Sequence, residues 1–181
     1  MHSFRHSKRA LQWLAMLAAC LTLAACGFHL RGAADLPFKT IYMDFAPNSP
    51  VGVELKRNLA ASGAQVVDDR DGAEANLKVL NDTRGNQVLT LNTNGRVREY
   101  ALFQYFTFSV SDAKGAVIIP PTAITLRRVI TYDENQALAK QSEEALLYRD
   151  MQSDLVQQIL RRLSASKSAL ATEKSATDGN D

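Results

Sequence analysis

The sequence predicts an α+β fold, a two-layer sandwich with two helices packed on one face of a mostly antiparallel sheet of about four strands. Two observations lead to this prediction. Residues 40–45 and 100–110 alternate in the two-residue period of half-buried strands. Residues 50–62 and 137–163 carry apolar side chains at helical spacing instead. The order of strand, helix, strands, helix shows no internal repeat.

The first half of the domain is expected to run strand, helix, short strand. Thr40–Phe45 alternates as a strand, Asn48-Ser49-Pro50 then supplies a cap and a proline for the first helical turn, and Gly63 supplies a stop. A short strand is expected around Ala64–Val67, before the polar break at 68–74. Three apolar helix residues are expected to face roughly one way: Val53, Leu55 and Leu59.

The middle of the chain is rich in predicted strands. Leu77 and Val79 alternate with Lys78 and Leu80, and Val88–Leu91 is a short aliphatic run. Asn94-Gly95 follows as a strong signal for a type I′ hairpin. Lys114-Gly115 marks the next turn, and Pro120-Pro121 indicates a sheet edge or a bulge before the chain resumes as residues 122–132.

One long strand in this region is apolar on both faces. One face carries Tyr100, Leu102, Phe106, Phe108 and Val110, and the other carries Phe103, Tyr105, Thr107 and Ser109. Because helices would cover one side of the sheet, Phe103 and Tyr105 are left needing a partner.

The last predicted element is a long amphipathic helix that begins at Ala137. Its apolar residues recur every four positions, at Leu147, Met151, Leu155, Ile159 and Leu163. Residues 164–181 are mostly small and polar and have nothing to bury, so we expect a disordered polar tail. Residues 37–163 are expected to form a single domain.

The N-terminus predicts a bacterial lipoprotein. Three basic residues and a short apolar run make residues 1–25 a cleavable export signal, because the run of about 15 residues is shorter than the ~20 that a spanning helix needs. Leu23-Ala24-Ala25-Cys26 has small residues before a cysteine that can carry a lipid, so residues 26–36 are expected to be a lipidated tether. Acyl chains would hold the protein to a membrane.

Two alternatives to lipidation at Cys26 remain open. The first alternative is lipidation at Cys20, because the same tetrapeptide occurs at Leu17-Ala18-Ala19-Cys20. Cys26 is favoured because Gly27 follows it and the apolar run before it is longer. Cys26 would be merely a small apolar residue if the signal were an ordinary secretory one. Gly27 is not the aspartate associated with inner-membrane retention, so the outer membrane is the expected location.

Composition excludes several classes of function. Cleavage would leave 18 Lys and Arg against 19 Asp and Glu, a formal charge of −1, which gives no global attraction to nucleic acid. One Cys and one His, His29, would remain, too few for a four-ligand zinc or iron–sulfur site. Asp68-Asp69 and Glu143-Glu144 are interpreted as solvated charges. We therefore predict no catalytic residue, no metal and no cofactor, and a protein that is not an enzyme.

The predicted sheet is basic although the chain is not. Residues 75–132 hold seven basic residues against three acidic ones. Guanidinium and ammonium groups beside apolar strands would suit an anionic amphiphile. The alternative is that these charges only solubilise the sheet and protect its edges.

The opening Cys26-Gly27-Phe28-His29-Leu30-Arg31-Gly32 resembles the start of mature members of the LPS-assembly lipoprotein LptE (RlpB) family. The resemblance continues at Asn94-Gly95, Glu99-Tyr100 and Gln136-Ala137-Leu138-Ala139-Lys140 and covers about residues 23–163. It implies two helices on a four-stranded sheet and a non-enzymatic role. The lipoprotein would plug the lumen of the outer-membrane β-barrel LptD, support folding and oxidation of that barrel, and help pass lipopolysaccharide to the outer leaflet.

The resemblance also implies basic residues that contact lipopolysaccharide. Lys140 matches one family position, whereas Thr93 stands where an arginine stands in relatives, so Arg96 and Arg98 are candidates to replace it. The alternative is a free-standing periplasm-facing lipoprotein that binds an anionic amphiphile or spaces the envelope without a barrel partner.

Overall fold

The computed structural model describes residues 35–177. The predicted export signal, both candidate lipidation cysteines and the tether up to residue 34 lie outside the described residues. The elements are β1 (Thr40–Asp44), α2 (Pro50–Ala61), β2 (Gln65–Val67), β3 (Ala75–Leu91), β4 (Val97–Asp112), β5 (Val117–Thr131), the 3-10 helix η1 (Glu134–Gln136) and α3 (Ala137–Thr177). No helix in this range is long and apolar enough to cross a bilayer.

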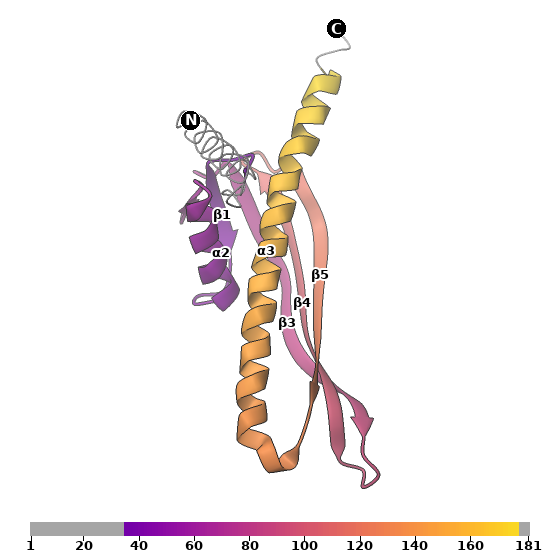
Figure 1. Ribbon diagram of the computed structural model, residues 1–181. Coiled ribbons are helices and arrows are strands. Elements are labelled where there is room, and N and C mark those ends of the chain that lie inside the picture. Colours follow the sequence, from indigo (N-terminus) through magenta and orange to yellow (C-terminus); the bar gives the residue numbers. More distant parts are fainter. Residues whose placement is uncertain (1–34, 178–181) are drawn as a thin grey trace, which may run out of the picture. The chain divides into compact units, whose positions relative to one another are not determined.

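The strands form one sheet in the order β2-β1-β3-β4-β5. β1 is parallel to β2 and β3, and the pairs β3–β4 and β4–β5 are antiparallel. Both helices lie on the same side of this sheet (Figure 1). The predicted α+β sandwich is therefore confirmed, with five strands in place of about four.

The predicted runs at Leu77–Leu80 and Val88–Leu91 belong to one strand, β3. The residues between them are polar and show no alternation, yet they pair with β4 along their whole length. Backbone hydrogen bonding to a long neighbour holds residues 81–87 extended without a buried side-chain face.

The core lies between the sheet and the two helices. β4 contributes the predicted inward residues, and α3 contributes its predicted apolar stripe. The largest fully buried apolar side chains from these two elements are Leu102, Phe106, Phe108, Met151, Leu155, Ile159 and Leu163. The expectation for Val53 was wrong, because this side chain is 60% exposed and Val51 is buried in its place. Val51, Leu55 and Leu59 follow the helical period of 3.6, which Val53 does not share.

The predicted hairpin at Asn94-Gly95 is present, but its turn is not type I′. Gly95 has φ of 75° and Asn94 is not among the residues with positive φ. Gly95 N–H donates to the Asn92 carbonyl at 3.0 Å, and Asn92 N–H donates to the Arg96 carbonyl at 2.8 Å. This is a three-residue loop with a left-handed glycine, the next most common hairpin connection. Gly115, with φ of 86°, closes the same kind of loop between β4 and β5.

The last strand and the last helix agree with the sequence in part. β5 is an edge strand that contains Pro120-Pro121, as predicted, and its pairing with β4 shifts register between Phe108 and Val110. α3 runs to Thr177, so residues 164–177 are helical where a disordered tail was expected. Alanine and lysine favour helix, and Lys167 pairs with Asp35 at 2.6 Å beyond the predicted domain end.

Candidate functional site

The predicted residues Arg96 and Arg98 line one hollow at the end of the β3–β4 hairpin. The hollow has a volume of about 320 Å³, and its remaining walls come from the end of β5 and from η1. Both arginines are exposed residues. The full lining is Asn92, Arg96, Val97, Arg98, Thr131, Tyr132, Asp133 and Asn135.

The hairpin loop and the end of β5 build this hollow. The side-chain oxygen of Asn92 accepts from Arg96 N–H at 3.0 Å, which holds the first residue after the turn. Tyr132 N–H donates to the Arg98 carbonyl at 2.8 Å, which ties the end of β5 to β4. These backbone contacts fix where the two arginine side chains leave the hairpin.

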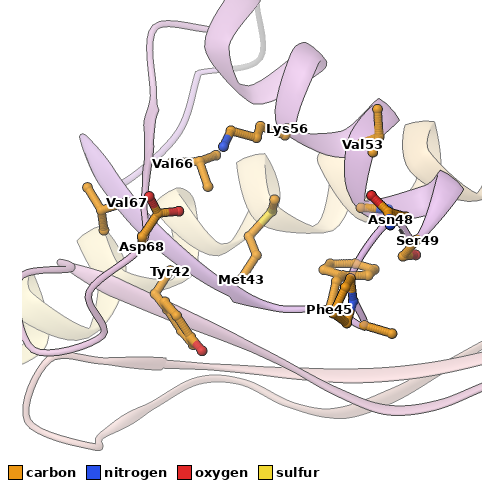
Figure 2. Close-up of a pocket in the computed structure, with 13 residues that line it drawn as sticks. Tyr42, Met43, Phe45, Asn48, Ser49, Val53, Lys56, Val66, Val67 and Asp68 are labelled. Atoms are coloured by element: carbon orange, nitrogen blue, oxygen red, sulfur yellow. Dashed lines mark hydrogen bonds between the residues drawn. The ribbon is translucent and has the colours of Figure 1, made fainter.

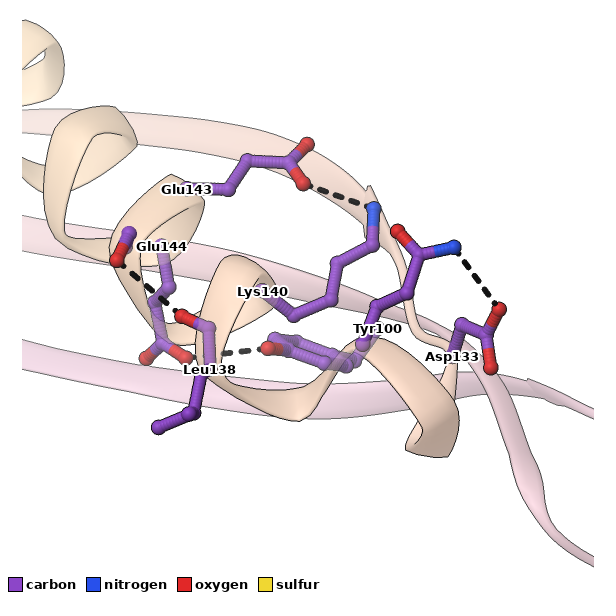
Figure 3. Close-up of polar contacts among 8 residues, drawn as sticks. Tyr100, Asp133, Leu138, Lys140, Glu143 and Glu144 are labelled. Atoms are coloured by element: carbon purple, nitrogen blue, oxygen red, sulfur yellow. Dashed lines mark hydrogen bonds and ion pairs between the residues drawn. The ribbon is translucent and has the colours of Figure 1, made fainter.

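Lys140 lies at the same end of the fold, near the start of α3, but it is not among the residues that line the hollow. Its Nζ is 2.8 Å from Oε2 of Glu143. Figure 3 shows Lys140, Glu143 and Asp133 in one view, with the ammonium directed to Glu143. The structure therefore brings Arg96 and Arg98 together and holds Lys140 to one side in an ion pair.

Tyr100 fastens the first turns of α3 to the sheet. Its hydroxyl donates to Oε2 of Glu144 at 3.1 Å, and its ring lies 6.0 Å from the ring of Tyr132. Burial, together with the hydrogen bond and the negative charge of Glu144, raises the pKa of Tyr100 to about 12. Tyr100 therefore stays neutral at physiological pH and can donate this bond.

Tyr148 makes a second contact of the same kind, one turn farther along α3. Its hydroxyl donates to the Gly85 carbonyl at 2.9 Å, and the Arg84 guanidinium lies 5.7 Å from the centre of its ring. Burial raises the pKa of Tyr148, the Glu144 charge raises it further, and Arg84 opposes the shift. Polar contacts thus attach α3 to the hairpin where the buried apolar stripe ends.

Comparison with known proteins identifies the family of this chain. The profile of the family described as LptE, lipopolysaccharide-assembly, matches residues 38–163. The chain belongs to the LptE family. Two curated relatives are LPS-assembly lipoproteins LptE. The one from Pectobacterium atrosepticum is 27% identical over 154 residues and covers 80% of each chain. The one from Yersinia enterocolitica is 28% identical over 165 residues, covering 86% of this chain and 75% of its own.

Solved structures of similar lipoproteins share the fold. Lipoprotein B from Nitrosomonas europaea is 36% identical with a TM-score of 0.69, over 79% of this chain and 94% of its own. A minor lipoprotein from Acinetobacter baumannii is 30% identical with a TM-score of 0.60, over 74% of this chain and 96% of its own. The resemblance to the LptE family that the sequence indicated is thus confirmed.

Exposed apolar side chains of this LptE family member gather near the arginine hollow and were not predicted as part of a site. Val88, Leu89 and Leu91 are exposed at the hairpin end of strand β3. Leu138, near the start of α3, is 82% exposed. The signal was present in the aliphatic run Val88–Leu91 directly before the hairpin turn. Tyr132 was also missed, because it joins the hollow through the pairing of β5 with β4. Asn92 was missed because its contact with Arg96 N–H depends on the conformation of the hairpin loop.

Phe103 and Tyr105 lie on the sheet face opposite the helices, as their alternation predicted. Their ring centres are 5.5 Å apart, and Tyr105 is 44% exposed. Gly85 on the neighbouring strand lies beside the Phe103 ring, and a Cβ there would be in ordinary van der Waals contact with it, at 3.6 Å. An exposed aromatic pair on an uncovered sheet face is the kind of surface that partners contact.

A second hollow of about 400 Å³ lies between β1, β2 and the start of α2 (Figure 2). Met43 points toward Lys56 in this view and Tyr42 points to the other side of β1. The hollow contains none of the predicted ligand residues. Within residues 35–177 no group of three His, Cys, Asp or Glu residues is placed to hold a metal ion.

Proposed function

We propose that this protein is a lipid-anchored outer-membrane component that plugs the lumen of the β-barrel LptD and binds lipopolysaccharide during transfer to the outer leaflet. The observation that carries the proposal is the hollow in which Arg96 and Arg98 stand together, beside exposed aliphatic side chains. Membership in the lipopolysaccharide-assembly family supports the same role. A protein with this task carries and positions its ligand and performs no chemistry on it.

The chemistry of the hairpin end suits a phosphorylated lipid. Guanidinium groups bind phosphate with paired hydrogen bonds, so Arg96 and Arg98 would hold the charged headgroup. Val88, Leu89 and Leu91 offer apolar surface on the same hairpin for acyl chains. Lys140, at the start of α3, would add a third positive charge to the headgroup site.

The uncovered face of the sheet suits a barrel wall. Phe103 and Tyr105 form a tilted aromatic pair there, on the side that neither helix covers. Tyr105 presents an apolar ring and a hydroxyl, a combination enriched at protein interfaces. The wall of LptD would supply the partner that this face lacks within its own chain.

The lipid anchor would be attached to the end of the domain that lies far from the hairpin. Asp35, the first described residue, pairs with Lys167 and lies shortly before β1, which pairs with the start of β3. β3 then extends for 17 residues to the hairpin, about 55 Å at ~3.3 Å per residue. A lipid at Cys26 would therefore hold one end of the domain at the periplasmic membrane surface while the hairpin reaches into the lumen.

The proposal is tested by lipopolysaccharide binding to charge-reversed variants. The test variant is Arg96→Glu with Lys140→Glu, and the matched control is Arg70→Glu with Lys114→Glu. Arg70 and Lys114 are exposed and lie away from the hollow, and Lys114 occupies the equivalent loop at the other end of β4. Deep-rough lipopolysaccharide in nonionic detergent is the probe.

We expect the test variant to lose at least tenfold in affinity and the control to lose little, with both melting temperatures near that of the wild type. Equal losses in the two variants would mean that only overall charge matters and would remove Arg96 and Lys140 from the site. Binding of lipopolysaccharide with no LptD recovered from membranes would favour the free-standing lipoprotein instead.

A further inference from the structure

The ammonium of Lys140 is engaged by a carboxylate on its own helix. Nζ lies 2.8 Å from Oε2 of Glu143, three residues later in α3, and the Lys140 side chain is 18% exposed while that of Glu143 is 45% exposed. Lysine side chains usually extend into water. In this protein the Glu143 side chain extends toward the Lys140 ammonium and meets it (Figure 3).

We propose that Glu143 sets the affinity of the lipopolysaccharide site by competing with the ligand phosphate for Lys140. The inference rests on the proposed function and adds to it a residue that weakens binding. A phosphate that reaches Lys140 must displace the Glu143 carboxylate. The free energy needed to break this ion pair therefore reduces the net binding free energy of the ligand. The same pair re-forms when the ligand leaves and thereby assists release.

The exposure of the Glu143 carboxylate, whose side chain is 45% exposed against 18% for Lys140, makes the displacement feasible. Ion pairs on an exposed helix surface contribute little, since water screens them and long side chains lose entropy in forming them. A phosphate group carries more charge than a carboxylate and offers more acceptor oxygens. The competition therefore lowers the affinity without preventing binding, and its removal should raise the affinity by a small factor.

The neighbouring carboxylate, that of Glu144, has a different role. Glu144 accepts the hydroxyl of Tyr100 at 3.1 Å and so joins α3 to β4. Consecutive helix residues point about 100° apart, so Glu143 and Glu144 face different groups. Glu144→Gln removes the same charge next to Glu143 and keeps an oxygen acceptor, which makes it the matched control. Asp150→Asn, on an exposed part of the same helix, controls for net charge.

The experiment measures binding of deep-rough lipopolysaccharide to Glu143→Gln in the wild-type and Lys140→Met backgrounds. We expect Glu143→Gln to tighten binding up to about fivefold, the range expected for a partly exposed ion pair. Glu144→Gln and Asp150→Asn should tighten it less. In the Lys140→Met background the gain from Glu143→Gln should vanish, because the competition needs Lys140.

A chemical readout reports on Lys140 directly. Acylation by an N-hydroxysuccinimide ester, followed by peptide mass spectrometry, should modify Lys140 faster in Glu143→Gln than in the wild type. Lipopolysaccharide should protect Lys140 in both proteins. Unchanged Lys140 reactivity in Glu143→Gln would show that the pair does not hold the ammonium.

The possible failures are distinguishable. If Lys140→Met weakens binding but Glu143→Gln changes nothing, the competition is absent and the proposed function stands. If the gain from Glu143→Gln persists in the Lys140→Met background, it is a general charge effect and the inference is overturned. If the wild type binds no lipopolysaccharide, the proposed function and the inference fail together.

Discussion

The hydroxyl of Tyr100 on β4 donates a hydrogen bond of 3.1 Å to Oε2 of Glu144 on α3, across 44 residues of chain. Tyr100 lies at the hairpin end of β4, where the buried apolar stripe of α3 has given way to polar contacts. This bond and the bond from Tyr148 to Gly85 hold the start of α3 against the hairpin. They therefore set the position of Lys140 relative to Arg96 and Arg98.

Titration of Tyr100 provides the first prediction. Its pKa is raised from 10.0 to about 12, by burial first and by Glu144 second. Glu144→Gln should lower this pKa but leave it above 10.0, because burial persists. The measurement is the absorbance of tyrosinate against pH, taken as the difference between each protein and its Tyr100→Phe counterpart. A Tyr100 that titrates identically with and without Glu144 would contradict the assigned bond.

The same shift predicts how stability depends on alkaline pH. The folded protein keeps the Tyr100 proton up to a pKa of about 12, whereas the unfolded chain loses it near 10.0. The stabilisation is therefore complete below pH 10 and is lost as pH rises from 10 toward 12. Tyr100→Phe should show a shallower fall in melting temperature over this interval than the wild type. A fall of equal slope would show that Tyr100 does not contribute.

Gln104 should be replaceable by an apolar residue with a gain in stability. It is fully buried on the helix side of β4, its Nε2 donates to Asp82 at 3.2 Å, and its Oε1 has no donor within the described residues. Gln104→Leu removes the unsatisfied acceptor and leaves the exposed Asp82 to water. We expect a gain of about 1 kcal/mol in chemical denaturation. Gln104→Glu, which buries a charge, should destabilise, and a loss in both variants would refute this explanation.

Gly52 should not tolerate alanine, although it lies inside helix α2. A Cβ there would stand 3.0 Å from Cγ and 3.1 Å from Cβ of Phe45, whose ring stacks on Phe106 with centres 6.1 Å apart. The near end of the Phe45 side chain cannot swing away, so we expect Gly52→Ala to cost about 1–3 kcal/mol despite the better helix propensity of alanine. Gly72→Ala, whose Cβ meets nothing closer than 3.8 Å, is the control and should be nearly neutral.

Cys26 is predicted to be the lipidated residue. Cys26→Ala should accumulate as an uncleaved or unacylated chain, while Cys20→Ala should mature normally. Metabolic labelling with a palmitate analogue and the mass of the mature chain report both outcomes. Labelling that survives Cys26→Ala and disappears in Cys20→Ala would move the anchor to Cys20.

The sequence predicted the parts of the fold that depend on local periodicity. Met151, Leu155 and Ile159 are buried because their four-residue spacing repeats without interruption, and Phe106 and Phe108 are buried because the strand alternates cleanly. The parts that were wrong depend on the surroundings. The polar middle of β3 is a strand because β4 pairs with it, and residues 164–177 are helical without an apolar stripe to signal it.

The candidate site was also predictable only where it depends on residues close together in the sequence. Arg96 and Arg98 follow the same hairpin turn and are two residues apart, so the sequence places them together, and both line the hollow. Lys140 has a flexible side chain that could form several contacts. The three-residue spacing from Glu143 was therefore not enough to predict their ion pair. Tyr132 joins the hollow only through the pairing of β5 with β4.

The measurement that tests the central proposal most directly is affinity purification of the mature lipoprotein from mildly solubilised outer membranes, with mass spectrometry of the proteins recovered. Tyr105→Glu, which places a charge on the uncovered sheet face, is the variant to compare with the wild type. We expect a large LptD-like barrel in about equal amount with the wild type and much less of it with Tyr105→Glu. Recovery of lipid without any barrel would contradict the plug.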